Sequence, residues 1–289
     1  MPIASIIFDF DPLLRLSDGI TIRWQTVALV AVIAAGLIVA GLAARREGLR
    51  PDDLLFIAVA TVPGAVVGGR LGYVLLHLDY YGTNSSAVLD PGQGSLELSL
   101  AVIGGVISGS YVAALLGAPL GRWMRAAALP LLFVLGTGKL AMVLGGAGQG
   151  QPADLPWATA YAGAGSWGSL AAALPSHPAQ AYEGLGTLAL LVALILALAA
   201  GVFESRDGRL FLVGLGGWAL VRAVASVTWR DPAIVAGLNA VGLIDMAIAL
   251  GCGLGYVTLA RRRSGPDAAK RGGASRDVTW ADPEARPPF

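Results

Sequence analysis

Apolar residues along this chain occur in blocks of about 20, separated by short polar breaks. That spacing is typical of helices that cross a lipid bilayer, since a run of this length spans the hydrocarbon core. The pattern predicts seven transmembrane helices, over residues 24–44, 54–78, 96–117, 123–147, 180–203, 209–229 and 239–260. We therefore expect an all-α membrane protein with one seven-helix domain over residues 1–263.

Basic residues in the polar breaks lie mostly on one side of this expected bundle. Fourteen Lys and Arg residues fall on one side and three on the other, so the positive-inside rule predicts an outside N-terminus and an inside C-terminus. The outer segments 79–95 and 148–179 are rich in Gly, Pro, Ser and Asp, which predicts a small extracytoplasmic loop cap. Residues 264–289 are polar and predict a disordered cytoplasmic tail.

Composition narrows the classes of function. The 289 residues are 55% hydrophobic and 13% charged, with a mean hydropathy of +0.68, which argues against a soluble enzyme. A net charge of +1 excludes a strongly basic nucleic-acid binder. The single Cys252 excludes disulfide scaffolds and thiolate metal clusters, and His77 and His177 show no metal-ligand spacing, so we expect neither a metal nor a cofactor.

Several ionisable residues fall inside the expected crossings. They are three cations and two carboxylates, with a further carboxylate at an edge: Arg70, Lys139, Arg222, Glu183, Asp245 and Glu97. Such a residue costs roughly 2.5–3.5 kcal/mol at a helix centre, so the group needs partners, water or a ligand. The first five lie in the outer half of the bundle, and their surplus of positive charge predicts a polar cavity for the phosphate of an anionic lipid.

A purely structural interpretation of these charges stays open. Arg70 can pair with Glu183 or Asp245 and so only fix the packing of the helices. Lys139 lies close enough to the outer end of its helix to extend toward the interface.

His177, in the stretch PSHPAQAYE, is the better of the two histidines for acid–base chemistry. An imidazole at an interface titrates near neutral pH. The residue also fits a structural cap that bonds a loop, and we favour the cap. Glu183 follows near a helix N-terminus, where a carboxylate is favoured for structural reasons alone.

Glycine-rich stretches predict helix packing rather than nucleotide binding. Pairs spaced four apart, such as Gly64 with Gly68 and Gly105 with Gly109, suit close helix contacts. The stretch GTGKL at 136–140 resembles a phosphate-binding loop, but Leu140 stands where Ser or Thr is needed and the context is a membrane helix.

Three stretches give the chain a specific resemblance, namely VGGRLGYVLL at 67–76, IGGVISG at 103–109 and LPSHPAQAYEG at 174–184. Over residues 20–260 the sequence resembles the bacterial prolipoprotein diacylglyceryl transferase family. The resemblance implies a multi-pass enzyme of the bacterial cytoplasmic membrane that uses no cofactor. It would move diacylglycerol from phosphatidylglycerol to the lipobox cysteine thiol next to the signal peptide of a secreted prolipoprotein, leaving glycerol phosphate.

The resemblance also implies site residues. Catalytic roles fall on Lys139 and Arg222, which would stabilise the leaving group, and on His177 as the substitute for a family histidine that this chain lacks; His177 or water would accept the thiol proton. Substrate binding falls on the matching motif positions Gly69, Arg70, Tyr73, Gly104, Gly105, Gln180, Tyr182 and Glu183.

The chain departs from the family pattern where chemistry is expected. The replacements are Ile103 for a histidine, Lys139 for an arginine, Met142 and Gly145 for asparagines, Ala147 for a glutamate and Gln25 for a tyrosine. Lys139 keeps a positive charge but loses the bidentate grip on phosphate. If the family histidine is a general base, its loss removes roughly two to four powers of ten in rate.

These departures leave two other functions in view. One is a non-catalytic member of the family that binds an anionic lipid or a lipoprotein. The other is a small-solute transporter, which is disfavoured because the buried charges occupy one half of the bundle and no internal repeat is visible.

Overall fold

The computed structural model describes residues 5–17, 19–90, 94–163 and 165–264. Within them, seven helices are long and apolar enough to cross a membrane, which confirms the predicted number of crossings. The expected tail, apart from residue 264, lies outside the described residues.

The long helices are α1 (Trp24–Arg46), α2 (Pro51–Leu76), α4 (Leu98–Leu115), α5 (Leu120–Ala141), α6 (Ala179–Ala199), α7 (Arg209–Ser226) and α8 (Ala240–Ser264). Three short helices connect them, α3 (Leu78–Thr83), η1 (Ser85–Leu89) and η2 (Met142–Gly145).

Local chemistry sets several of these boundaries. Pro51 opens α2, where its missing N–H costs nothing, and two aspartates follow in the first turn. The prediction of one helix over 123–147 was wrong at its end, since α5 stops at Ala141 and η2 continues to Gly145. Gly146 follows with φ +71°, a left-handed conformation typical of the residue after a helix.

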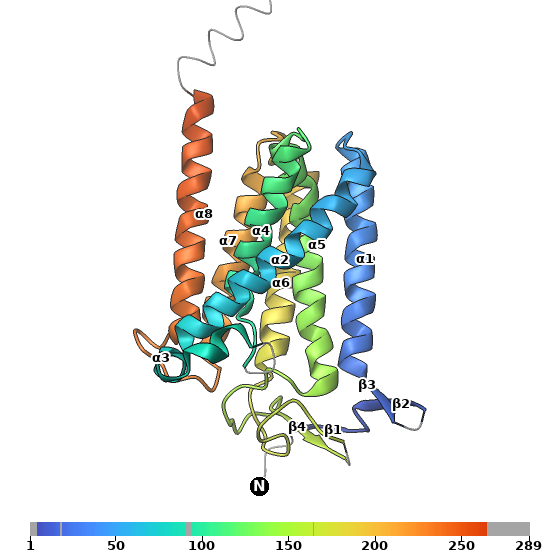
Figure 1. Cartoon of the computed structure of the whole chain (residues 1–289), viewed down its shortest axis with the longest axis vertical. Coiled ribbons are helices and arrows are strands. Elements are labelled where there is room, and N and C mark those ends of the chain that lie inside the picture. The colour runs from blue at the N-terminus through green and yellow to red at the C-terminus, as the bar shows by residue number, and fades with distance from the viewer. Residues whose placement is uncertain (1–4, 18, 91–93, 164, 265–289) are drawn as a thin grey trace, which may run out of the picture.

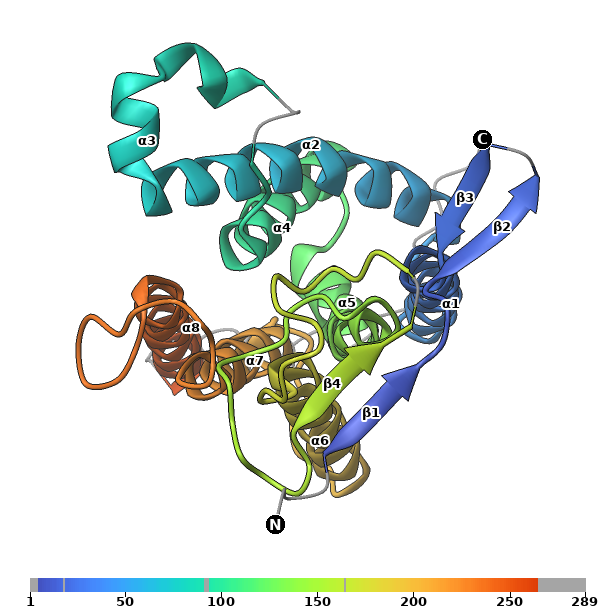
Figure 2. The ribbon, with the colours of Figure 1, turned by 90° about the horizontal axis from the view of Figure 1, so that it is seen from below.

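The fold also contains four short strands that the sequence analysis did not predict. Strand β1 (Ile6–Asp9) pairs in parallel with β4 (Thr159–Ala162), and β2 (Leu13–Ser17) pairs antiparallel with β3 (Ile20–Arg23). All four lie at one end of the bundle, which we call the strand end (Figures 1 and 2). The fold is therefore mostly helical rather than purely helical.

Glycines bring α2 and α4 into close contact. A Cβ on Gly64 would clash with the backbone oxygen of Gly104, and a Cβ on Gly104 would clash with that of Gly64. A Cβ on Gly68 would likewise clash with the backbone oxygen of Leu100. These contacts confirm that the small residues spaced four apart on α2 serve helix packing.

The opposite end of the bundle carries a different charged contact. Glu47 binds Arg125 and Arg206, each with a nitrogen–oxygen distance of 2.9 Å. This contact ties the end of α1 to α5 and to the loop before α7. The membrane side that each end faces stays a prediction from the charge distribution.

Helix α7 lies at the centre of the bundle. In its most apolar stretch of 18 residues, 61% of the residues are buried, against 33% or less in the corresponding stretches of the other six spans. Leu215 and Trp218 of α7 pack in the main core with Leu132 of α5 and Leu194 of α6. A polar side chain that points from α7 toward its neighbours is therefore deeply buried.

Candidate active site

Arg222 of α7 is the centre of a buried group of charges at the strand end. Its side chain is 3% exposed and forms ion pairs of 2.8 Å with Glu183 and 3.3 Å with Asp245. A third carboxylate, that of Glu97, lies 3.6 Å away. These partners come from α6, from α8 and from the residue before α4, so Arg222 joins three elements.

Lys139 of α5 completes this group through a shared carboxylate. Its Nζ lies 2.9 Å from Oε2 of Glu183, whose other oxygen binds Arg222. Ser99 bridges the same region, because its hydroxyl donates to Asp245 and accepts from Nε of Arg222 at 3.1 Å. We call Glu97, Lys139, Glu183, Arg222 and Asp245 the charge cluster.

The balance of the charge cluster differs from the prediction. Sequence positions suggested a surplus of cations, yet these contacts join two cations to three carboxylates. Glu97 enters because it caps α4, where its oxygens each accept at 2.7 Å from the backbone N–H groups of Ser99 and Leu100. Fully ionised, the cluster is acidic by one charge and carries no surplus for an anion.

Arg70 has a different set of described partners. Its guanidinium donates to the backbone oxygens of Val88 at 2.6 Å, Ala87 at 2.6 Å and Asp90 at 3.0 Å, and lies 5.3 Å from the centre of the Tyr81 ring. These contacts attach η1 to α2. The expected grouping of Arg70 with the other two cations is not seen in the described contacts, and neither is its pairing with Glu183 or Asp245.

Two tryptophans flank the buried cations. The ring of Trp229 lies 5.1 Å from the Arg222 guanidinium and 5.8 Å from Nζ of Lys139, and Trp218 lies 5.3 Å from Arg222. At these distances the ring faces attract a cation electrostatically. The ring of Trp229 therefore lies beside both cations of the charge cluster.

A cavity of about 220 Å³ opens beside Lys139 and Glu183, and we call it the polar cavity. Its other lining residues come from three places: the segment after η2, the first turn of α6 and the segment after α7. They are Gly148, Gln149, Gln180, Trp229, Arg230 and Asp231.

Arg230, which follows the end of α7, is a site residue that the sequence analysis did not single out. Its Nε donates to the backbone oxygen of Gly150 at 2.7 Å, and its other described acceptors are Gln149 and Ser176, both at 3.4 Å. All of these acceptors are neutral. Trp229 and Arg230 are neighbours in the stretch WRDP at 229–232, where a cation beside an aromatic residue at a helix end was the available signal.

Two buried glutamines line the polar cavity and differ in their hydrogen bonds. Gln149 donates to the backbone oxygen of Thr159 at 2.7 Å and accepts from Ser169 at 2.5 Å. Gln180 is 2% exposed and donates to the hydroxyl of Tyr161 at 3.0 Å, but its Oε1 has no partner in the described residues. One acceptor of Gln180 is therefore unused in the described residues, and the part of this residue in substrate binding stays a prediction.

Tyr161 holds the amide of Gln180 from the strand end. It belongs to β4 and packs between Phe8 of β1, with ring centres 5.3 Å apart, and Trp167, at 4.8 Å. Burial raises the pKa of Tyr161 to about 12, so the phenol stays protonated at neutral pH. The unpredicted β1–β4 pair therefore positions a residue of the site.

His177 has structural contacts at the edge of the site. Its backbone accepts from Gly150 at 2.8 Å and donates to Gln151 at 2.9 Å. Its Nδ1 lies 3.3 Å from the Tyr182 hydroxyl, which also accepts from Trp157 at 2.8 Å. These bonds hold the loop around His177 in place, which is the structural role that the sequence analysis favoured for this residue. A catalytic role for His177 stays a prediction.

The remaining motif positions on α2 and α4 lie in helix contacts. The backbone oxygen of Gly69 accepts from Glu97 at 2.9 Å, and Tyr73 stacks on His77 with ring centres 4.2 Å apart. Gly104 faces α2, whereas Gly105 lines a second cavity. Their predicted part in substrate binding is untested.

Two of the departures from the family pattern are neighbours in space. A Cβ on Gly145 would collide with the amide of Gln25, so a glycine at 145 leaves the room that this side chain occupies. Ile103, in contrast, packs against the apolar core around Trp218.

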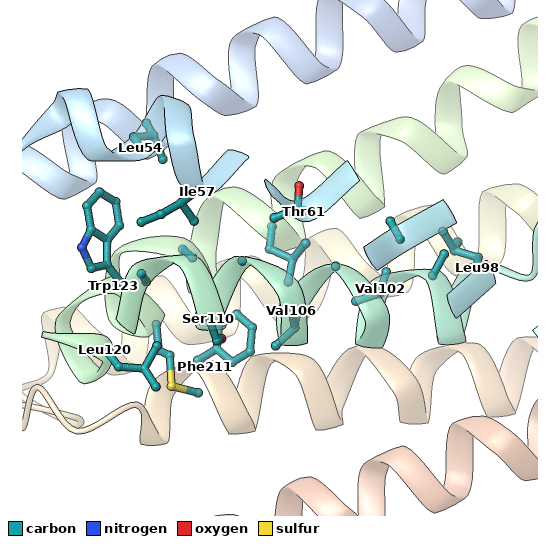
Figure 3. A pocket seen from close by; sticks show the side chains of 18 residues that line it. Leu54, Ile57, Thr61, Leu98, Val102, Val106, Ser110, Leu120, Trp123 and Phe211 are labelled. Carbon is teal, nitrogen blue, oxygen red and sulfur yellow. The ribbon is translucent and has the colours of Figure 1, made fainter. Parts of the chain in front are cut away.

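The second cavity has a volume of about 350 Å³ and lies among α2, α4, α5 and α7 (Figure 3). Nearly all of its lining is apolar, and we call it the apolar cavity. It begins at Leu98, the residue between Glu97 and Ser99, and reaches Trp123 near the start of α5.

Comparison with known proteins identifies relatives over most of the chain. The sequence model of prolipoprotein diacylglyceryl transferases matches residues 12–259. The phosphatidylglycerol-prolipoprotein diacylglyceryl transferase of Methylocella silvestris is 30% identical over 275 residues, 88% of this chain and 94% of its own length. The proteins of that name from Geobacter sulfurreducens and Trichormus variabilis are 28% and 26% identical, over 80% and 92% of this chain and 86% and 96% of theirs.

Proposed function

Because the chain belongs to the prolipoprotein diacylglyceryl transferase family, we propose that it transfers the diacylglyceryl group of phosphatidylglycerol to the lipobox cysteine of a prolipoprotein. The thiol sulfur bonds to the glyceryl carbon, and the bond from that carbon to the phosphate oxygen breaks. Glycerol phosphate leaves, and the thiol proton passes to a base. The seven spans fit a multi-pass enzyme of the bacterial cytoplasmic membrane.

One observation carries this proposal beyond family membership, namely that the polar and apolar cavities both adjoin the charge cluster. Lys139 and Glu183 line the polar cavity, and Leu98 of the apolar cavity is flanked in sequence by Glu97 and Ser99. A phospholipid has the same division into a polar head and apolar chains. Its glyceryl carbon would then lie between the two cavities, at the charge cluster.

Lys139 and Arg230 are the cations that we assign to the phosphate. Both line the polar cavity, and the described hydrogen-bond acceptors of Arg230 are neutral oxygens, so no described ion pair holds its guanidinium. Arg230 also keeps the planar fork that suits phosphate, which Lys139 lacks. This assignment replaces the sequence-based one, in which Arg70, Lys139 and Arg222 together held the phosphate.

Arg222 acts as a positioning residue in this proposal. Three carboxylates balance its charge, and through Glu183 it fixes the place of Lys139. Removing it would leave the buried carboxylates of Glu97 and Asp245 with no cation among their described contacts, which is costly in a low-dielectric interior. We therefore expect Arg222 to act on the phosphate through Lys139.

The thiol proton passes to His177 or to water. The backbone of His177 bonds Gly150 and Gln151, which follow Gln149 of the polar cavity, and its imidazole is the candidate that we put in place of the family histidine, whose position is Ile103. A water molecule within the polar cavity is the other acceptor. The two possibilities differ in their pH–rate profiles.

A non-catalytic lipid-binding protein is the second candidate function, and Ile103, Met142 and Gly145 are the observations that favour it. The experiment is transfer by the full chain in vesicles of phosphatidylglycerol to a synthetic lipobox peptide. We expect the peptide to gain the mass of diacylglyceryl while an equal amount of glycerol phosphate is released, and a peptide with serine for the cysteine to gain nothing. Lipid binding without any transfer would favour the second function.

A further inference from the structure

The apolar cavity follows one face of α4 along most of its length. The α4 residues that line it recur three or four apart, and those labelled in Figure 3 include Leu98, Val102, Val106 and Ser110. Residues at this spacing share a face of a helix. From Leu98 to Ala113 that face is about 22 Å long, taking 1.5 Å for each residue.

The two ends of the apolar cavity differ in chemistry. At one end Leu98 adjoins Glu97 and Ser99, which contact Arg222. At the other end the indole of Trp123 lies across from Leu54 (Figure 3).

Trp123 closes the far end as part of a packed group. It is 5% exposed and lies in a buried cluster with Ala44, Leu49, Ala113 and Ala126. A large aromatic ring held in this way makes a rigid wall.

From this geometry we infer that the apolar cavity holds one acyl chain of the lipid donor and that Trp123 limits the length of that chain. The inference rests on the proposed function. The methyl end of the chain lies against the indole, and the carboxyl end lies at the charge cluster. Chains that exceed the space before Trp123 bind more weakly, because the wall does not yield.

Length and chemistry both favour an acyl chain as the occupant. The hydrocarbon core of a bilayer is about 30 Å thick, so the disordered chains of one leaflet cover about 15 Å along the membrane normal, and the same chain reaches further when it lies extended in a groove of about 22 Å. The lining offers almost no hydrogen-bonding groups, which suits a saturated chain and disfavours a peptide with an unpaired backbone.

The experiment compares phosphatidylglycerols with dilauroyl, dimyristoyl, dipalmitoyl, distearoyl and diarachidoyl chains. Each is tested as a donor in the transfer assay and as a competitor against a labelled phosphatidylglycerol in a binding assay. Trp123→Leu opens the far end and should shift the preference toward longer chains. Val106→Phe fills the middle of the cavity and should shift it toward shorter chains. We expect each shift to change the ratio between two neighbouring lengths by roughly tenfold, since single methylene groups are discriminated on this scale.

Ile107→Phe is the matched control. Ile107 adjoins Val106 in sequence but is 65% exposed on the outer surface of α4, so the same added ring should leave the chain-length profile as in the unaltered protein. If Trp123→Leu does not fold, Val106→Phe and Ile107→Phe still provide the comparison.

Three outcomes would overturn the inference. One is an identical chain-length profile in all variants, and another is a shift in Ile107→Phe as large as that in Val106→Phe. The third is a change in the KM of the lipobox peptide alone, which would assign the cavity to the signal peptide. Absence of transfer by the unaltered protein would contradict the proposed function, while the binding assay would still test the chain-length limit.

Discussion

Glu183 of α6 and Arg222 of α7 form an ion pair of 2.8 Å in the most buried part of the bundle. Glu183 also holds Lys139 at 2.9 Å, so one carboxylate fixes two cations. The pair therefore joins the packing of the central helix to the polar cavity.

Replacing Glu183 with glutamine should destabilise the protein. Two buried cations would lose their shared carboxylate, and breaking a buried pair by removing one partner costs about 3–5 kcal/mol. Unfolding in detergent, followed by heating or denaturant, measures the loss. The control is Glu204→Gln, since Glu204 is exposed in the loop before α7, and it should unfold like the unaltered protein. Equal stability of the two variants would contradict a structural role for the pair.

Replacing Arg230 with glutamine should weaken binding of phosphatidylglycerol. A hydrogen bond to a charged group contributes about 1.5–3 kcal/mol, so the KM for the lipid should rise by roughly one to two powers of ten. Steady-state kinetics over a range of lipid fractions in mixed micelles measure this change. Arg15, on the strand end with a side chain 72% exposed, supplies the control Arg15→Gln. A similar KM in both variants would remove Arg230 from the phosphate site.

Replacing Arg70 with alanine should loosen η1 without a matching change in lipid KM. The substitution removes the three bonds to the backbone at Ala87, Val88 and Asp90. Limited proteolysis should then cut residues 78–90 faster than in the unaltered protein. A rise in lipid KM equal to that of Arg230→Gln, with unchanged proteolysis, would restore the sequence-based role of Arg70.

Replacing His177 with asparagine separates the two roles of that residue. If His177 is the base, kcat should fall by roughly two to four powers of ten and the acidic limb of the pH–rate profile should disappear. We expect the structural result instead, a lower Tm with kcat reduced less than tenfold and the profile retained, because the described bonds of His177 are those of a loop cap.

Tyr161 should ionise only at high pH. Its folded pKa of about 12 exceeds the ordinary value of about 10, so the folded state binds the phenolic proton more tightly than the unfolded state. The stabilisation is fully present below about pH 10 and is lost as the pH rises through about 12. The absorbance of phenolate in the unaltered protein minus that in Tyr161→Phe measures the midpoint, and a midpoint near the ordinary value would contradict the burial of this ring.

The helices were predictable because the bilayer imposes a length on each apolar run. The strands were not, since β1 and β4 are only four residues long each and pair across about half of the sequence. Residues at 6–9 show no alternation strong enough to indicate a partner near 160.

The sequence predicted how far along the helices the charged side chains lie, but not the helix face from which each one projects. Position along a helix placed Arg70, Lys139 and Arg222 at one end, and the structure joins the last two through Glu183. Depth does not specify the face of α2 from which Arg70 projects, and that face contacts η1. Arg230 was missed because it follows its helix and enters the site only through the fold of the loop.

The glycine contact between α2 and α4 has a mechanical consequence. The backbones of α2 and α4 are in contact at Gly64 and Gly104, with no side chains between them that could rearrange. The two helices therefore behave as one rigid pair. A lipid tail that enters the apolar cavity from the bilayer therefore cannot pass between them. It has to enter between this rigid helix pair and helices α5 and α7.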